Sequence, residues 1–335
     1  MDRKKIVVVG GGTGNHITLS GLKYEECDLT AVVAMTDSGG SSGRLRDELG
    51  HLPPGDVRQC LIALAPDDRS TALMARLFDY RFNAGNGLNG HSFGNLFLTA
   101  LTEITGDAAT AIAEASRMLS IKGTVLPVTL TKSTLMARLK DGSEVVGEAN
   151  IDQRKEKLDV TIDYIYLNPK AYAYPPVLEA ISRADAVVMG PGDIYTSILP
   201  NLLVEDVAQA IRDSSAVKIC VCNLMTKPGE SDGFKASDFV NLIREYLGTS
   251  SPLDYVVVNN APYPERLLQR YNSYGQYPVQ VDLEECDKVV REVVQEPLLS
   301  AGVYLRHDAR HLARTIIGIL NSYQPSAGSL RQADR

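Results

Sequence analysis

Short runs of β-branched and other apolar residues recur along this chain, and several of them end in a glycine-rich segment. The first two runs, residues 5–9 and 29–35, are separated by a stretch long enough for one helix. Three more occupy residues 186–189, 217–222 and 255–258. Such runs are typical of strands buried on both faces, and their alternation with helices indicates parallel βαβ units. The sequence therefore predicts an α/β, three-layer fold with a mainly parallel sheet.

Two segments interrupt this alternation. Helical periodicity prevails from about residue 56 to 120 and predicts a helical layer. An Asp-Gly pair at 141–142 lies between two extended runs, which predicts an inserted β-hairpin over about 133–165. We expect a single domain over residues 1–325 and a disordered polar tail over 326–335.

Composition narrows the functional class. The 335 residues include 34 Lys and Arg against 41 Asp and Glu, and the net charge of −7 argues against nucleic-acid partners. No apolar run approaches the roughly 18 residues of a membrane span, so we expect no membrane insertion. The basic N-terminus lacks a signal-peptide core, and five cysteines without framework spacing suit reduced thiols. We therefore expect a cytoplasmic protein, with a homodimer as the default state.

The first glycine-rich segment, residues 10–14, follows a predicted strand and leads into a predicted helix over 15–24. Backbone amides at such a helix N-terminus favour a phosphate group, although a tight βα turn without a ligand is the alternative. Asn15 and Ile17 stand where a dinucleotide fingerprint needs its third glycine. This departure disfavours a NAD-dependent oxidoreductase.

The second segment, residues 36–46, combines three glycines, three serines and two arginines, and we interpret it as a ligand-binding loop. The planar guanidinium of Arg44 can hold a phosphate through two hydrogen bonds. Asp37, at the end of a predicted strand, suits a ribose hydroxyl or a metal ion. The alternative is a solvated loop whose arginines pair with Asp47 and Glu48.

Three further polar residues suit either a structural or a binding role. Asp56 can cap the following helix or contact a ligand, and the two roles are weighted equally because both use the carboxylate oxygens. Ser92 is a candidate helix cap, and the Asn95 amide could bind a base or a sugar.

A last set of candidates follows the later strands. The segment Gly190-Pro191-Gly192-Asp193 mirrors the first glycine segment, and Asp193 could hold Mg²⁺ beside a diphosphate. Lys227 follows the next strand and should reach the same sheet edge. Arg306 precedes a helix predicted over about 308–323, where a guanidinium is unfavourable unless an anion is present.

Taken together, these segments resemble the YvcK-like proteins, also called gluconeogenesis factors, of the CofD-like superfamily. The resemblance covers nearly the whole chain and rests on residues 10–14, 37–46, 54–59, 91–95, 190–193 and 306–308. It implies a Rossmann-like fold, a cytoplasmic location and binding of a nucleotide sugar such as UDP-N-acetylglucosamine. It also implies a role in carbon use, cell shape and wall synthesis, with wall-synthesis proteins as partners.

The sister branch of that superfamily, the 2-phospho-L-lactate transferases, offers an alternative function. Those enzymes use Mg²⁺ to transfer a phospholactyl group from a guanosine diphospho-linked donor to a deazaflavin. Such an enzyme would need aromatic residues for stacking, and the candidates are Phe82, Phe93, Tyr172 and Tyr174. None of the five histidines is assignable to a serine nucleophile, so we expect no hydrolase of the serine type. Ala309 stands where several YvcK-like proteins carry a regulatory threonine.

The residues and the resemblance together define a predicted site. The predicted ligand-binding residues are Gly11, Gly12, Thr13, Gly14, Asp37, Ser38, Gly39, Gly40, Ser41, Ser42, Arg44, Asp56, Asn95, Gly190, Pro191, Gly192, Asp193, Lys227 and Arg306. If a reaction occurs, Asp37, Asp56 and Asp193 are the catalytic candidates, with Asp37 and Asp193 as Mg²⁺ ligands. No cofactor is implied beyond Mg²⁺ accompanying a nucleotide diphosphate.

Overall fold

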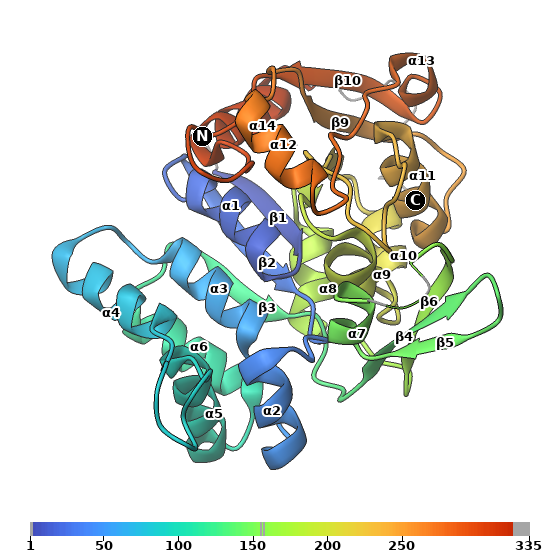
Figure 1. Cartoon of the computed structure of the whole chain (residues 1–335). Coiled ribbons are helices and arrows are strands. Elements are labelled where there is room, and N and C mark those ends of the chain that lie inside the picture. Colours follow the sequence, from blue (N-terminus) through green and yellow to red (C-terminus); the bar gives the residue numbers. More distant parts are fainter. Residues whose placement is uncertain (1–2, 155, 157, 324–335) are drawn as a thin grey trace.

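The computed structural model describes residues 3–154, 156 and 158–323 and contains a seven-stranded sheet in which every pair of neighbouring strands is parallel. The strand order is β10-β9-β8-β7-β1-β2-β3 (Figure 1). The strands are β1 (Lys4–Gly10), β2 (Cys27–Val33), β3 (Thr124–Pro127), β7 (Ala186–Met189), β8 (Val217–Val221), β9 (Leu253–Asn259) and β10 (Val290–Glu296). The sequence did not predict the two edge strands, because β3 is short and ends in proline and β10 is rich in exposed charge.

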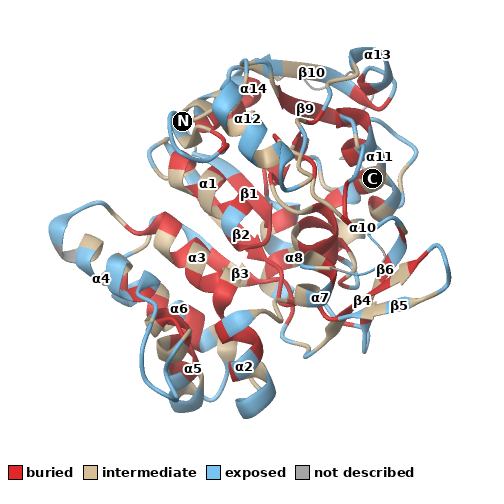
Figure 2. Ribbon diagram, in the orientation of Figure 1, coloured by how far each residue is buried: buried red, intermediate tan, exposed pale blue. Residues whose placement is uncertain are grey.

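Helices flank the sheet, and buried residues concentrate on the strands and on the helix faces that meet them (Figure 2). One packed group contains α1 (Gly12–Leu22), α3 (Gly55–Leu64) and α14 (Ala309–Ser322), and a second contains α8 (Pro175–Ser182), α10 (Val207–Asp213) and α11 (Ala236–Leu247). Three further helices are α9 (Leu199–Leu202), α12 (Glu265–Asn272) and α13 (Leu283–Cys286). No described helix is long and apolar enough to cross a membrane. The predicted α/β, Rossmann-like layered architecture is confirmed.

A lobe of helices lies beside β3 (Figure 1) and supplies the predicted helical layer. It contains α2 (Gly40–Leu49), α4 (Arg69–Asp79), α5 (Phe93–Thr105) and α6 (Ala108–Met118). The interpretation of residues 36–46 as one loop is wrong, because the chain is helical from Gly40 onward. Gly39 is extended at the N-cap and Gly50 is left-handed at the C-cap, with φ of 68°, so glycine bounds the helix at both ends.

The inserted β-hairpin is confirmed and is part of a three-stranded antiparallel sheet with the order β5-β4-β6. Its strands are β4 (Thr134–Leu139), β5 (Glu144–Val146) and β6 (Ile162–Asn168). The Leu139 amide donates to the Ser143 carbonyl at 2.9 Å and closes the predicted turn. A five-residue helix, α7 (Glu148–Asp152), follows the hairpin. The predicted tail over 326–335 lies outside the described residues.

The order in which the chain adds strands to the sheet reverses between β1 and β7, while all strands stay parallel. From β1 the chain adds β2 and β3 on one side, whereas β7 pairs with the other side of β1 and leads to β8, β9 and β10. The glycine-rich segments that follow β1 and β7 meet at this point. A Cβ atom on Gly14 would lie 1.7 Å from the Pro191 carbonyl oxygen, so only glycine permits the approach. Ligands of open parallel sheets bind at such a switch point.

Candidate functional site

A cavity of about 470 Å³ opens at the switch point, beyond the carboxyl ends of the strands. Such a volume lies within the usual range for small-molecule sites. The predicted site residues that line it are Gly12, Thr13, Gly14, Asp37, Asp56, Pro191, Gly192, Asp193, Lys227 and Arg306. The structure thus brings together residues from both ends of the sequence, as the sheet-edge argument predicted.

One wall of the cavity is built from backbone. Gly11 is the N-cap of α1 without a side-chain cap, and Gly12, Thr13 and Gly14 of the first helical turn line the cavity. Across from them, the side-chain amide of Asn223 fixes the turn after β7. It accepts a hydrogen bond from the Gly192 amide and donates one to the Gly192 carbonyl, both at 2.9 Å. The first turn of a helix faced by a rigid glycine turn suits an anionic group.

A second wall carries Asp37, Asp56 and Glu148, which we call the open carboxylate group. Burial and the negative charge of Asp37 raise the pKa of Asp56 well above its ordinary value, although the Gly12 amide donates to it. Burial and Asp37 likewise raise the pKa of Glu148 to about 7. Among the described residues, none of these carboxylates forms an ion pair with a lysine or arginine. Uncompensated carboxylates of this kind are candidates for binding a hard divalent cation.

The structure contradicts the alternative in which Asp56 caps the following helix. Pro54 occupies the N-cap position of α3, which has no side-chain cap, and Asp56 lies inside the first turn. Its carboxylate instead turns toward α1 and the cavity, since a Cβ on Gly12 would lie 2.5 Å from its Oδ1.

Glu148 reaches the cavity because Ser38 holds the start of α7. The Ser38 hydroxyl accepts from the Ala149 amide at 2.8 Å, and the Ser38 amide donates to Glu148 Oε2 at 3.2 Å. Ser38 therefore caps α7 from a distant segment, and it does not line the cavity. Asp152 stands four residues after Glu148 and shares that face of the helix. Neither acid was predicted, because a five-residue helix has no readable sequence period.

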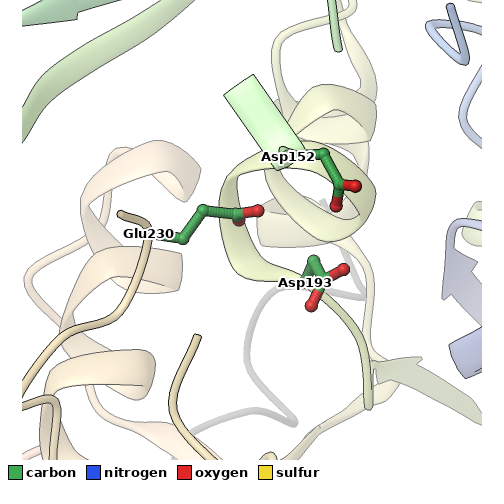
Figure 3. Close-up of side chains that lie close together, drawn as sticks. All are labelled: Asp152, Asp193 and Glu230. Atoms are coloured by element: carbon green, nitrogen blue, oxygen red, sulfur yellow. The ribbon is translucent and has the colours of Figure 1, made fainter. Parts of the chain in front are cut away.

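Asp152, Asp193 and Glu230 form a second cluster, which we call the lysine-filled carboxylate group (Figure 3). The ammonium of Lys227 contacts all three: Asp193 at 2.7 Å, Glu230 at 3.1 Å, and Asp152 through a short ion pair. Burial opposes the charge on Lys227, but the three carboxylates raise its pKa above the ordinary value. Burial also raises the pKa of Glu230 to about 8.

The two predicted Mg²⁺ ligands therefore lie in different environments. Asp37 belongs to the open carboxylate group, whereas Asp193 is paired with Lys227. A cation held by Asp37 has Asp56 and Glu148 as its neighbours on the cavity wall, not Asp193 paired to a lysine.

The rest of the serine- and glycine-rich segment makes its contacts with the protein outside the cavity. The Ser41 hydroxyl lies 3.0 Å from His91 Nδ1, and the side-chain amide of Asn95 donates to the Ser42 hydroxyl at 3.2 Å. Arg44 donates to the Asn89 carbonyl at 2.9 Å. The predicted site residues that do not line the cavity are Gly11, Ser38, Gly39, Gly40, Ser41, Ser42, Arg44, Asn95 and Gly190. Ser92 caps α5 as predicted, because its hydroxyl accepts from the backbone amide of Asn95 at 3.2 Å.

The last part of the wall comes from the segment before α14. Arg306 is exposed and lines the cavity. The Tyr271 hydroxyl, also at the cavity, accepts from the Leu305 amide at 3.1 Å. Next to Arg306, His307 Nε2 lies 3.1 Å from the Cys222 carbonyl and ties this segment to the end of β8. Sequence reasoning did not predict Tyr271 or His307 as site residues, although His307 belongs to the 306–308 segment on which the family resemblance rests.

Comparison with known proteins shows to which family the chain belongs. The family model described as 2-phospho-L-lactate transferase CofD matches residues 6–299. This chain belongs to the CofD family. The gluconeogenesis factor of Bacillus subtilis is 38% identical over 320 residues, 95% of this chain and 98% of its own. A Thermotoga maritima relative is 45% identical over 320 residues, 93% of this chain and 98% of its own, and bears a provisional form of that name.

A solved structure agrees with the fold. The crystal structure of a Bacillus halodurans protein described as a member of the UPF0052 family superposes with a TM-score of 0.88 at 39% sequence identity. The match covers 95% of this chain and 99% of the other. The sequence-based assignment to the CofD-like superfamily and its gluconeogenesis-factor branch is therefore confirmed.

Proposed function

We propose that this CofD-family protein binds a nucleotide sugar of the UDP-N-acetylglucosamine type in the switch-point cavity. Through that binding it acts as a cytoplasmic regulatory protein in carbon metabolism and in cell shape and wall synthesis. The names of its relatives support the link to gluconeogenesis. The observation that carries the binding proposal is the close approach of the α1 N-terminus and the Gly190–Gly192 turn at one cavity.

The charge of the cavity supports a divalent cation as part of the bound ligand. Five lining carboxylates face two lining cations, Lys227 and Arg306, among the described residues. A diphosphate adds further negative charge, so its binding requires compensation. Asp37, Asp56 and Glu148 offer the oxygen ligands that Mg²⁺ prefers, and Mg²⁺ commonly bridges carboxylates and phosphates. In this arrangement the α1 amides and Arg306 contact the diphosphate from the other sides.

Isothermal titration calorimetry tests the proposal with UDP-N-acetylglucosamine and with GDP, each with and without Mg²⁺. We expect Mg²⁺-dependent binding of the UDP sugar without turnover and no binding of GDP. Lack of binding to either nucleotide would contradict the proposal.

The alternative is a phospholactate transferase, which the family description names. It would predict Mg²⁺-dependent GDP binding and a stacking surface for a deazaflavin. Of the four aromatic candidates, none lines the cavity, although Tyr271 does. Phe93 packs against Phe97 with ring centroids 6.0 Å apart. The site geometry therefore gives this alternative no advantage. Wall-synthesis partners and a homodimer remain proposals from the sequence.

A further inference from the structure

Lys227 lies in the cavity wall, and its ammonium contacts three carboxylates. A lysine ammonium has three N–H donors, and here they meet three carboxylates. The carboxylates come from separate segments: Asp152 from α7, Asp193 from the turn after β7, and Glu230 from the segment after β8. A phosphate of the ligand would have to displace one of these carboxylates to bind the lysine directly. Lys227 is thus already neutralised by the protein.

The three carboxylates around Lys227 have the spacing of a metal site. One oxygen from each lies within 4.8 Å of the others, close enough to share one small cation. Glu230 is held in place without the lysine, because it accepts from the Tyr195 amide and from the Thr196 hydroxyl, both at 3.3 Å. Its side chain is 1% exposed. The arrangement should therefore survive removal of the ammonium.

We propose that Lys227 is a built-in cation that occupies a latent divalent-metal site formed by Asp152, Asp193 and Glu230. As a consequence, the wild-type chain binds no exchangeable divalent cation at these three carboxylates. Lys227 is a positioning residue, since it joins α7 to the Gly190–Gly192 turn and acts on the ligand through these segments. The part of this inference that concerns the ligand rests on the proposed function, whereas the occupancy of the latent site does not.

The test is the stoichiometry of Mn²⁺ binding, measured by electron paramagnetic resonance on the full chain without nucleotide. We expect Lys227→Ala to bind one more Mn²⁺ per chain than the wild type. The double variant Lys227→Ala/Glu230→Gln should lose that additional ion. Lys170→Ala, which removes an exposed lysine paired with Glu205, is the matched control and should leave the stoichiometry unchanged.

A folded Lys227→Ala protein that binds no additional Mn²⁺ would overturn the proposal, with circular dichroism as the check on folding. A second measurement does not depend on that variant. Glu230→Gln in the presence of Lys227 should leave Mn²⁺ stoichiometry at the wild-type value, and a lost ion would mean that the lysine-filled group binds metal after all. Because no nucleotide is present, a failure of the UDP-sugar proposal changes neither result.

Discussion

The open and the lysine-filled carboxylate groups contain three acids each and lie at one cavity, which the second group lines with Asp152, Asp193 and Lys227, yet they differ in what compensates their charge. In the open group, burial and mutual repulsion raise the pKa values of Asp56 and Glu148. In the other group, the ammonium of Lys227 supplies the opposite charge. The comparison teaches that the number of acids does not define a metal site. What matters is whether the fold has already provided a cation.

One helix connects the two groups. α7 contributes Glu148 to the open group and Asp152 to the lysine-filled group, four residues apart on one face. Five residues cannot form a stable isolated helix, so tertiary contacts hold it. Ser38 fixes its first turn and Lys227 contacts its last residue.

The sharpest test of the difference is the loss of one acid from each group. Asp56→Asn should weaken Mg²⁺-dependent binding of UDP-N-acetylglucosamine by roughly 100-fold or more, because it removes a proposed metal ligand. Asp152→Asn removes the charge of an acid that is paired with Lys227 but keeps an oxygen that accepts from the ammonium, so it should change the affinity by less than about threefold. Calorimetry measures both, and equal losses would erase the distinction between the groups.

The next largest effect should come from the arginine opposite the carboxylates. Arg306→Ala should cost about 1.5–3 kcal/mol of binding free energy if its guanidinium contacts the diphosphate. Arg310, one turn later, stacks 3.1 Å from the Tyr24 ring centre and does not line the cavity, so Arg310→Ala is the matched control. Arg44→Ala should also change affinity by less than about 0.5 kcal/mol, because Arg44 contacts Asn89 outside the cavity.

Protons should compete with the cation at the open group. Burial and Asp37 raise the pKa of Glu148 to about 7, so its carboxyl is largely protonated at lower pH. Mg²⁺ affinity, followed by calorimetry, should therefore rise with pH from about 6 to 8, by up to about tenfold per pH unit. Glu148→Gln should flatten that rise, and an unchanged profile would contradict the assignment.

The same shift makes a prediction for stability without metal. The folded pKa of Glu148 lies above its ordinary value of 4.5, so the native state holds this proton more tightly than the unfolded state. Its contribution to the free energy of unfolding is present at low pH and is lost as pH rises through about 7. Thermal unfolding of Glu148→Gln should show a smaller decline over this window than the wild type.

The smallest expected effect tests how α7 is held. Ser38→Ala removes the hydroxyl that accepts from the Ala149 amide and should lower the free energy of unfolding by about 1 kcal/mol. Because Glu148 would lose its fixed position, Mg²⁺ affinity should fall as well. Ser322→Ala is the control, since Ser322 is exposed and, among the described residues, its hydroxyl donates only to carbonyls of its own helix. A stability loss without a change in Mg²⁺ affinity would show that α7 does not position the open group.

Sequence reasoning succeeded where one local pattern decides the outcome. The apolar runs gave five of the strands in the parallel sheet, and the Asp-Gly pair gave the hairpin. It failed at β10, whose edge position allows exposed charges, and at α2, whose glycines and serines resemble a loop. For the site, glycine segments and acids after strands were informative. Ser38, Ser42 and Asn95, which were also predicted to bind the ligand, instead form hydrogen bonds within the protein.

The sequence by itself determined the α/β class, the family and the presence of polar, glycine-rich segments at one sheet edge, because these depend on short-range pattern and motif. Only the tertiary structure decided which acids share a wall and which acids hold Lys227. The switch point between β1 and β7 brings Gly14 against Pro191, and α7 arrives from the inserted sheet. Charge compensation acts over a few ångströms between residues distant in sequence, so it becomes visible only when the chain is folded.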